Sequence, residues 1–160
     1  MKILAVQSRM GIGDTVIFLP FIKALSKKFN SPISILVKEN SKANQYLHQT
    51  KYIDKILILE RDNKTNNRHG GFFGIFKLAN DLKKYKFDKI FIFNSSLRFN
   101  LIAKISGIPQ IYQYPLFAKN KQHIIEAPKK FLKENLNLDI NEDPEVQIDN
   151  DSISKAAQKF

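Results

Sequence analysis

Residues 2–15 read KILAVQSRMGIGDT. Four apolar residues follow Lys2, a pattern typical of a short strand buried on both faces of a sheet. The glycines that come next predict a tight turn ending at Asp14. From Thr15 to Phe29 apolar residues recur every three or four positions, which indicates a helix, with a kink or irregular turn at Pro20. Strand, glycine turn and helix in this order are the expected opening of a parallel α/β fold.

The rest of the chain continues the alternation. Further strands are predicted at residues 32–37, 55–59, 89–93 and 111–114, and helices at 41–50, 73–85, 96–106 and 123–136. The strands are continuous apolar runs, which suits a sheet covered on both faces. In the helix at 73–85 the inner side is expected to hold Ile75, Phe76, Leu78, Ala79 and Leu82. The pattern predicts a Rossmann-like α/β fold of three layers, with a parallel sheet and right-handed crossovers.

Two stretches lack this periodicity. Residues 61–71 are polar and predict a loop, and residues 137–151 are acidic and predict a last strand or a linker. Residues 1–150 are enough for one compact domain. Residues 151–160 begin like a helix, and we expect them to start the connection to a second domain.

Composition excludes some chemistry. The chain has no cysteine, so it has no disulfide, thiolate metal site or cysteine nucleophile. His48, His69 and His123 have no partners at ligand spacing, so neither a metal nor another cofactor is expected. The N-terminus does not resemble a signal peptide and no apolar run has the length of a membrane span, so a cytoplasmic location is expected.

The formal net charge of +11 has two explanations. An anionic partner is one: nucleic acid, a phosphorylated glycolipid or a membrane surface. A proteome rich in lysine and asparagine would give the same charge without any such partner. Nucleic-acid binding has only the charge in its favour, since no recognition helix or aromatic RNA-binding pattern is present.

The turn at residues 11–14 fits neither common nucleotide motif. A dinucleotide fingerprint needs a third glycine where Val16 stands, and a P-loop needs lysine where Asp14 stands. A carboxylate at the mouth of the sheet can accept a proton from a sugar hydroxyl. An aspartate at a helix start is also a common cap, which is the simpler interpretation from spacing alone.

Longer motifs add a resemblance to a known family. Residues 2–8, Gly13-Asp14-Thr15-Val16, Leu19-Pro20 and Ala24-Leu25 together resemble the opening of glycosyltransferase family 9, the ADP-heptose:lipopolysaccharide heptosyltransferases and their relatives. Residues 52–57 resemble the family's entry to its third strand. Residues 87–94 with Ser96-Leu97-Arg98 are similar to its Tyr-Asp strand and Ser-Leu-Arg turn.

The resemblance implies a function and a site. The chain would be the N-terminal, acceptor-side half of a two-domain GT-B glycosyltransferase, inactive without its donor-binding half. The donor would be a nucleotide sugar such as ADP-heptose. The acceptor would be a lipopolysaccharide core or another glycolipid, met by peripheral contact at the inner face of the cytoplasmic membrane. Asp14 is expected to be the catalytic base, and Gly13, Ser8, Arg9, Ser96 and Arg98 are expected to bind substrate. The alternative is a stand-alone flavodoxin-like module that binds a small ligand or a partner without catalysis.

Overall fold

The computed structural model describes residues 1–9, 11–61, 66–116, 123–146 and 158. Five strands form one parallel sheet in the order β3-β2-β1-β4-β5. Their bounds are β1 (Ile3–Val6), β2 (Ile33–Lys38), β3 (Ile53–Leu59), β4 (Lys89–Ile92) and β5 (Gln110–Gln113). The parallel sheet predicted from the sequence is therefore confirmed, strand for strand.

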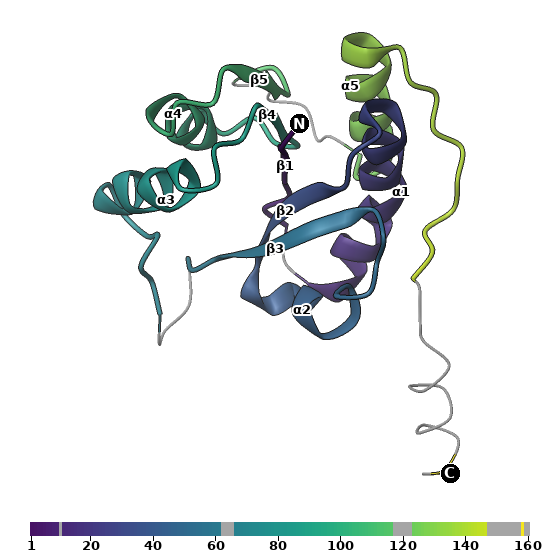
Figure 1. Cartoon of the computed structure of the whole chain (residues 1–160), viewed down its shortest axis with the longest axis horizontal. Helices are drawn as coiled ribbons and strands as arrows, with labels where there is room; N and C mark the ends of the chain where they lie inside the picture. Colours follow the sequence, from purple (N-terminus) through teal and green to yellow (C-terminus); the bar gives the residue numbers. More distant parts are fainter. Residues whose placement is uncertain (10, 62–65, 117–122, 147–157, 159–160) are drawn as a thin grey trace.

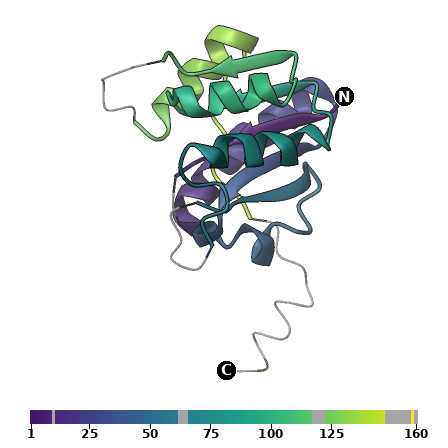
Figure 2. The ribbon, with the colours of Figure 1, turned by 90° about the vertical axis from the view of Figure 1, so that its left-hand side faces the viewer.

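Helices cover both faces of this sheet (Figure 1). One layer holds α1 (Ile12–Phe29), the short α2 (Ala43–Tyr46) and α5 (Glu126–Leu136), and the other holds α3 (Phe73–Lys83) and α4 (Leu97–Ile105). Turning the molecule shows α3 and α4 side by side (Figure 2). The three-layer Rossmann-like arrangement is as predicted.

Alternation along each strand divides the core in two. In β1, Ile3 and Ala5 pack toward α1 and α5, whereas Leu4 and Val6 pack toward α3 and α4, because successive strand residues point to opposite faces. All four are buried. On the α1 side the core is aromatic, with Phe18, Phe93, Tyr114 and Phe131 in edge-to-face contact.

The strand order places a switch point between β1 and β4. From β1 the chain runs outward through β2 and β3, then crosses back to β4 and β5 on the other side. Ligands of such sheets bind outside the carboxyl ends of the strands at this reversal. The segments that follow β1 and β4 are thus the place to look for a site.

The start of the first helix differs from prediction. The first helix begins at Ile12, not after Asp14, so Gly13 and Asp14 lie in its first turn. Gly11 makes the reversal alone, with φ of 104°, a backbone conformation that favours glycine. The helix continues through Pro20, where a kink or an irregular turn is predicted.

The predicted helix at 41–50 was mostly wrong. A 3₁₀ turn at Glu39–Ser41 is separated from α2 by Lys42, whose φ of 53° interrupts a right-handed helix. Phe76 is also misplaced by the prediction, since it is 47% exposed. Ile75, Leu78, Ala79 and Leu82 already complete the buried stripe of α3, and Phe76 lies about 100° around the helix from Ile75.

The segment after α5 runs back beside α1 (Figure 1). Glu142 holds it there through ion pairs to Lys23 and Lys27, at 3.0 and 2.6 Å. Residues 137–146, part of the stretch predicted to be a last strand or a linker, form no strand. The expected domain boundary at 150 and the expected helix start at 151–160 lie outside the described residues, apart from position 158. In the part of the chain that is described, no helix is long and apolar enough to cross a membrane.

Candidate functional site

A cavity of about 200 Å³ opens at the switch point. It lies among the ends of β1, β4 and β5, the inner face of α1 and the start of α5. Its polar lining comes from Ser8, Arg9, Asn94, Ser95, Tyr114 and His123, and its apolar lining from Phe18, Phe93, Ile124, Ala127 and Pro128. A small cavity with an apolar wall and a few convergent polar groups is typical of a ligand site.

Asn94 joins the two sides of the switch point. Its side-chain amide donates to Ser8 Oγ at 3.1 Å, and its Oδ1 accepts the Ser96 backbone N–H at 2.9 Å. Two of the expected substrate-binding residues, Ser8 and Ser96, are thus brought to one network by a residue that was not predicted to belong to the site.

Gln113 holds the same segment from the other side. Its side-chain amide donates to the carbonyl oxygens of Asn94 and Ser96, at 3.1 and 2.8 Å. Its Oε1 accepts from Asn100 of α4 at 3.0 Å. The backbone between β4 and α4 is therefore held by the side chains of Asn94 and of Gln113 in β5.

Asp14 lies in the first turn of α1, at the carboxyl edge of the sheet. It is four residues before Phe18, which lines the cavity, so the two share one face of the helix. The carboxylate is partly exposed, and none of the ion pairs among the described residues involves it. Nor does it form the side-chain cap of α1, whose N-cap position is Gly11 without any side-chain cap bond. A helix start nevertheless favours its negative charge.

Gly13 leaves open space beside Asp14. A Cβ placed on Gly13 would meet no atom within 4 Å apart from its chain neighbours and the backbone of its own helix, and the residue is exposed. Its helical backbone does not require glycine, so nothing in the fold itself explains this residue. The expected close approach of a sugar to the Gly13 backbone stays a prediction.

Tyr114 and Arg9 are neighbours at the cavity. Burial raises the pKa of the Tyr114 hydroxyl above its usual range, and the positive charge of Arg9 opposes that rise only in part. Tyr114 therefore stays a neutral hydroxyl at physiological pH. Arg9 itself is exposed, which places a cation at the rim of the cavity.

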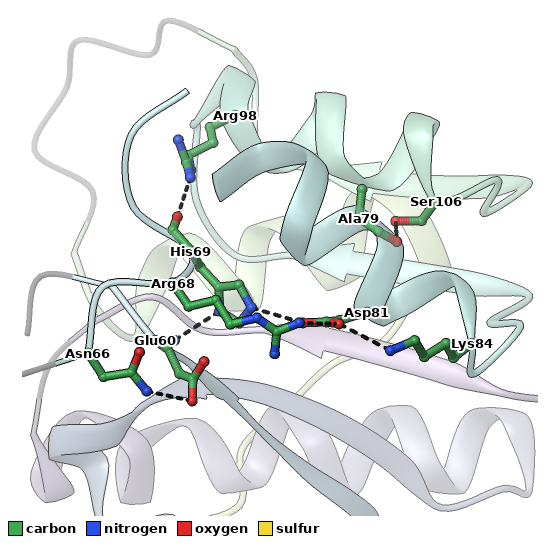
Figure 3. Close-up of polar contacts among 9 residues, drawn as sticks. All are labelled: Glu60, Asn66, Arg68, His69, Ala79, Asp81, Lys84, Arg98 and Ser106. Carbon is green, nitrogen blue, oxygen red and sulfur yellow. Dashed lines mark hydrogen bonds and ion pairs between the residues drawn. The ribbon is translucent and has the colours of Figure 1, made fainter. Parts of the chain in front are cut away.

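Arg98 forms hydrogen bonds with another part of the chain. Its guanidinium donates to the Gly71 carbonyl at 2.7 Å and to the His69 carbonyl, both in the loop before α3. Figure 3 shows the bond to His69. These bonds cross from α4 to a segment nearly thirty residues earlier. The structure gives Arg98 a structural contact, and its contact with an acceptor stays a prediction.

The loop that Arg98 holds is anchored a second time by Asp81 of α3 (Figure 3). Asp81 pairs with Arg68 at 2.8 Å, His69 Nε2 at 3.1 Å and Lys84 at 3.4 Å. His69 is buried, and its Nδ1 accepts the Glu60 backbone N–H at 3.0 Å. These bonds hold the described end of the predicted polar loop in place. Spacing along the sequence could not reveal the partners of His69.

Sequence reasoning missed Asn94, Gln113, Tyr114 and His123. A polar residue directly after an apolar strand was the available signal for Asn94, since the ends of parallel strands meet at one edge. The sequence around His123 excludes only a metal-ligand spacing, whereas in the structure His123 lines the cavity. Among the described residues, no three His, Asp or Glu side chains gather as a metal site would require.

Comparisons with known proteins agree on the fold. No family model matches the chain, and no curated protein matches it. Among solved structures, a glycosyl transferase family 9 protein from Veillonella parvula matches with a TM-score of 0.74 at 18% identity, covering 98% of this chain and 48% of that one. The E. coli ADP-heptose LPS heptosyltransferase II matches at 0.68 and 16%, covering 100% of this chain and 50% of that one.

A third match is the E. coli heptosyltransferase WaaC with ADP, with a TM-score of 0.57 at 12% identity. It covers 89% of this chain and 49% of that one. The chain therefore spans about half the length of the structures that it matches. At these identities the likeness shows the fold: an α/β Rossmann-like domain shared with one half of heptosyltransferases and family 9 glycosyltransferases.

Proposed function

We propose that the chain is the acceptor-side half of a glycosyltransferase that moves a sugar, heptose in the first instance, from an ADP-linked donor to a lipopolysaccharide core or similar glycolipid. The observation that carries this is the position of Asp14. A partly exposed carboxylate that has no ion pair with the described residues lies at the carboxyl edge of a Rossmann-like sheet, in a domain whose structural neighbours are heptosyltransferases.

In this proposal Asp14 acts as a general base. An acceptor hydroxyl attacks the anomeric carbon of the donor, the bond from that carbon to the diphosphate oxygen breaks, and the hydroxyl proton passes to the Asp14 carboxylate. Attack from the side opposite the leaving group inverts the configuration. The nucleotide diphosphate departs with the bonding electron pair.

The other residues at this edge would position the acceptor. Ser8, Ser95 and Asn94 offer hydroxyl and amide groups for sugar hydroxyls, and Arg9 offers a cation for an acceptor phosphate or carboxylate. Gly13 would let a sugar ring approach the helix start. Arg98 would contribute from the neighbouring turn. The nucleotide would be held mainly by the second, donor-binding half.

The test compares variants in the longer enzyme that contains both halves, with ADP-heptose and a lipopolysaccharide-core acceptor and ADP release as the readout. Asp14→Asn keeps the size of the side chain but removes the proton acceptor, so kcat should fall by about 10²–10⁴-fold with the melting temperature unchanged. Asp143→Asn, at an exposed carboxylate far from this edge, is the matched control.

The chain by itself should fold, bind acceptor and transfer nothing. Sugar transfer by the chain alone would overturn the half-enzyme proposal, and turnover of Asp14→Asn close to that of the parent would return Asp14 to a capping role. Tight binding of a small ligand with no transfer by the longer protein would favour the stand-alone binding module.

A further inference from the structure

The outer face of α3 and α4 carries an unusual set of exposed apolar side chains. Phe72, Phe73 and Phe76 are 66, 76 and 47% exposed at the start of α3. Their rings contact one another, with centroids 5.9 Å apart for Phe72 and Phe73 and 5.5 Å apart for Phe72 and Phe76. A cluster of three exposed phenylalanines contributes little to the core, and exposed apolar clusters of this kind mark interaction surfaces.

A second apolar row lies on α4. Leu97, Leu101 and Ile105 are exposed and follow one another at intervals of four residues, which places them on one side of that helix. The two helices are adjacent (Figure 2). Ser106 Oγ at the end of α4 donates to the Ala79 carbonyl of α3 at 3.2 Å. The aromatic cluster and the aliphatic row therefore form one surface, here called the α3–α4 face.

The charge of this face has one sign. The two helices contain Lys77, Lys83, Arg98 and Lys104, against a single acidic residue, Asp81. Asp81 is already occupied by Arg68, His69 and Lys84. Lys77, Lys83 and Lys104 are exposed and none takes part in an ion pair among the described residues. Phenylalanine and leucine beside unpaired lysines is the composition of a surface that lies on an anionic bilayer.

We propose that the α3–α4 face rests on a membrane containing anionic phospholipid. Phe72, Phe73 and Phe76 would enter the boundary between headgroups and acyl chains, and the lysine ammonium groups would lie among the phosphates while their stems cover apolar surface. A second copy of this chain fits the face less well, because a twofold interface would set the lysines of one copy against those of the other. Lipid phosphate supplies the opposite charge.

The α3–α4 face lies next to the candidate site. Phe72, Phe73 and Leu97 lie at the starts of their helices, hence at the carboxyl edge of the sheet, and Leu97 directly follows Ser96 of the candidate site. An acceptor embedded in the bilayer would emerge beside the crevice between β1 and β4. Membrane docking does not depend on the proposed sugar transfer, since it rests on the α3–α4 face alone.

The test is sedimentation of the full chain with vesicles of phosphatidylcholine, with and without phosphatidylglycerol. Binding is expected only with phosphatidylglycerol and should weaken as salt is added. Phe73→Ser with Phe76→Ser should lower the vesicle affinity at least about tenfold, and Lys77→Glu with Lys104→Glu by a similar factor. Lys28→Glu with Lys51→Glu makes the same change of net charge on exposed residues outside α3 and α4 and should bind like the parent.

Three binding results would overturn the proposal: no binding to anionic vesicles, equal losses in the two lysine pairs, or a phenylalanine variant that binds like the parent. Two further results would overturn it by pointing to another occupant. A dimer that the phenylalanine variant dissolves would assign the face to a second copy, and a large fall in its melting temperature would assign the face to another part of the protein.

Discussion

Asn94 donates its side-chain amide to Ser8 Oγ over 3.1 Å, joining the segment after β4 to the segment after β1. The two residues are 86 positions apart in the sequence, and they meet because β1 and β4 are neighbours at the point where the strand order reverses. Since Asn94 Oδ1 also accepts the Ser96 N–H, one side chain sets the spacing of two expected substrate-binding residues.

The first prediction separates these two bonds. Asn94→Ala removes both and should lower the free energy of unfolding by about 1–3 kcal/mol, the cost of leaving such partners unpaired. Asn94→Asp keeps the acceptor for Ser96, and its second carboxylate oxygen can accept from the Ser8 hydroxyl in place of the donated bond, so its loss should be smaller. Urea unfolding of both variants, of Ser8→Ala and of the double variants gives the coupling energy between positions 8 and 94. A coupling energy near zero would mean that the bond between Ser8 and Asn94 does not contribute to the stability of the fold.

The second prediction concerns two helical glycines that look alike in sequence. A Cβ on Gly74 would lie 2.2 Å from the carbonyl carbon of His69 and 2.3 Å from its oxygen, whereas a Cβ on Gly13 would meet nothing within 4 Å. Alanine normally favours a helix over glycine by about 1 kcal/mol. Gly13→Ala should therefore keep or raise the melting temperature, while Gly74→Ala should lose about 1–3 kcal/mol through overpacking.

Thermal melts of the two alanine variants test this pair directly. Similar melting temperatures for both would show that the loop at His69 can move away from α3. The same Gly13→Ala variant probes the site, because a methyl group at an expected sugar contact should raise the acceptor KM of the longer enzyme while stability is kept.

The sheet was predictable because its signal is local. A buried parallel strand is a continuous apolar run, so Ile3–Val6 and Lys89–Ile92 could be placed without knowing their neighbours. The polar network was not predictable in the same way. Nothing along the sequence pairs Asn94 with Ser8, Arg98 with Gly71 or His69 with Asp81, because each contact is created by strand order and crossover geometry.

Phe76 illustrates the opposite failure. Its apolar character and its place beside Ile75 indicated burial, yet the helix has room on its inner face for only one stripe. An apolar residue outside that stripe is information about a surface, and in this chain it belongs to the α3–α4 face.

The third prediction tests the two roles of Arg98. Arg98→Ala removes its bonds to the carbonyl groups of His69 and Gly71 and should lower the melting temperature. If Arg98 also binds the acceptor, the acceptor KM of the longer enzyme should rise even when it is measured well below the melting temperature of the variant. The rise should be equivalent to about 1.5–3 kcal/mol, with the donor KM little changed. Arg98→Lys keeps the charge and loses the planar fork. An unchanged acceptor KM in Arg98→Ala would remove the residue from the site and leave it as a clamp on the loop.

The last prediction follows from the charge of Asp81. Partial burial raises the pKa of its carboxyl group, but the hydrogen bond from His69 and the charges of Arg68 and Lys84 outweigh burial and leave the pKa below its ordinary value. A carboxyl group with a lowered pKa in the folded state binds protons more readily when unfolded. Its contribution to stability is therefore fully present above the unfolded pKa, near 3.8, and is lost as pH falls through the lower, folded pKa.

Urea unfolding from pH 7 to pH 3 measures this contribution. Asp81→Asn should be less stable than the parent at pH 7 and should lose less stability on acidification, whereas Asp143→Asn, at an exposed carboxylate, should follow the parent.

His69 makes a further variant informative. Because Nδ1 accepts the Glu60 N–H, the ring of neutral His69 carries its hydrogen on Nε2, facing Asp81. An asparagine oxygen can still accept that hydrogen and an alanine cannot, so Asp81→Ala should cost more than Asp81→Asn at pH 7. Equal costs would mean that Asp81 stabilises the loop through its charge on Arg68 and Lys84 alone, without the bond to His69.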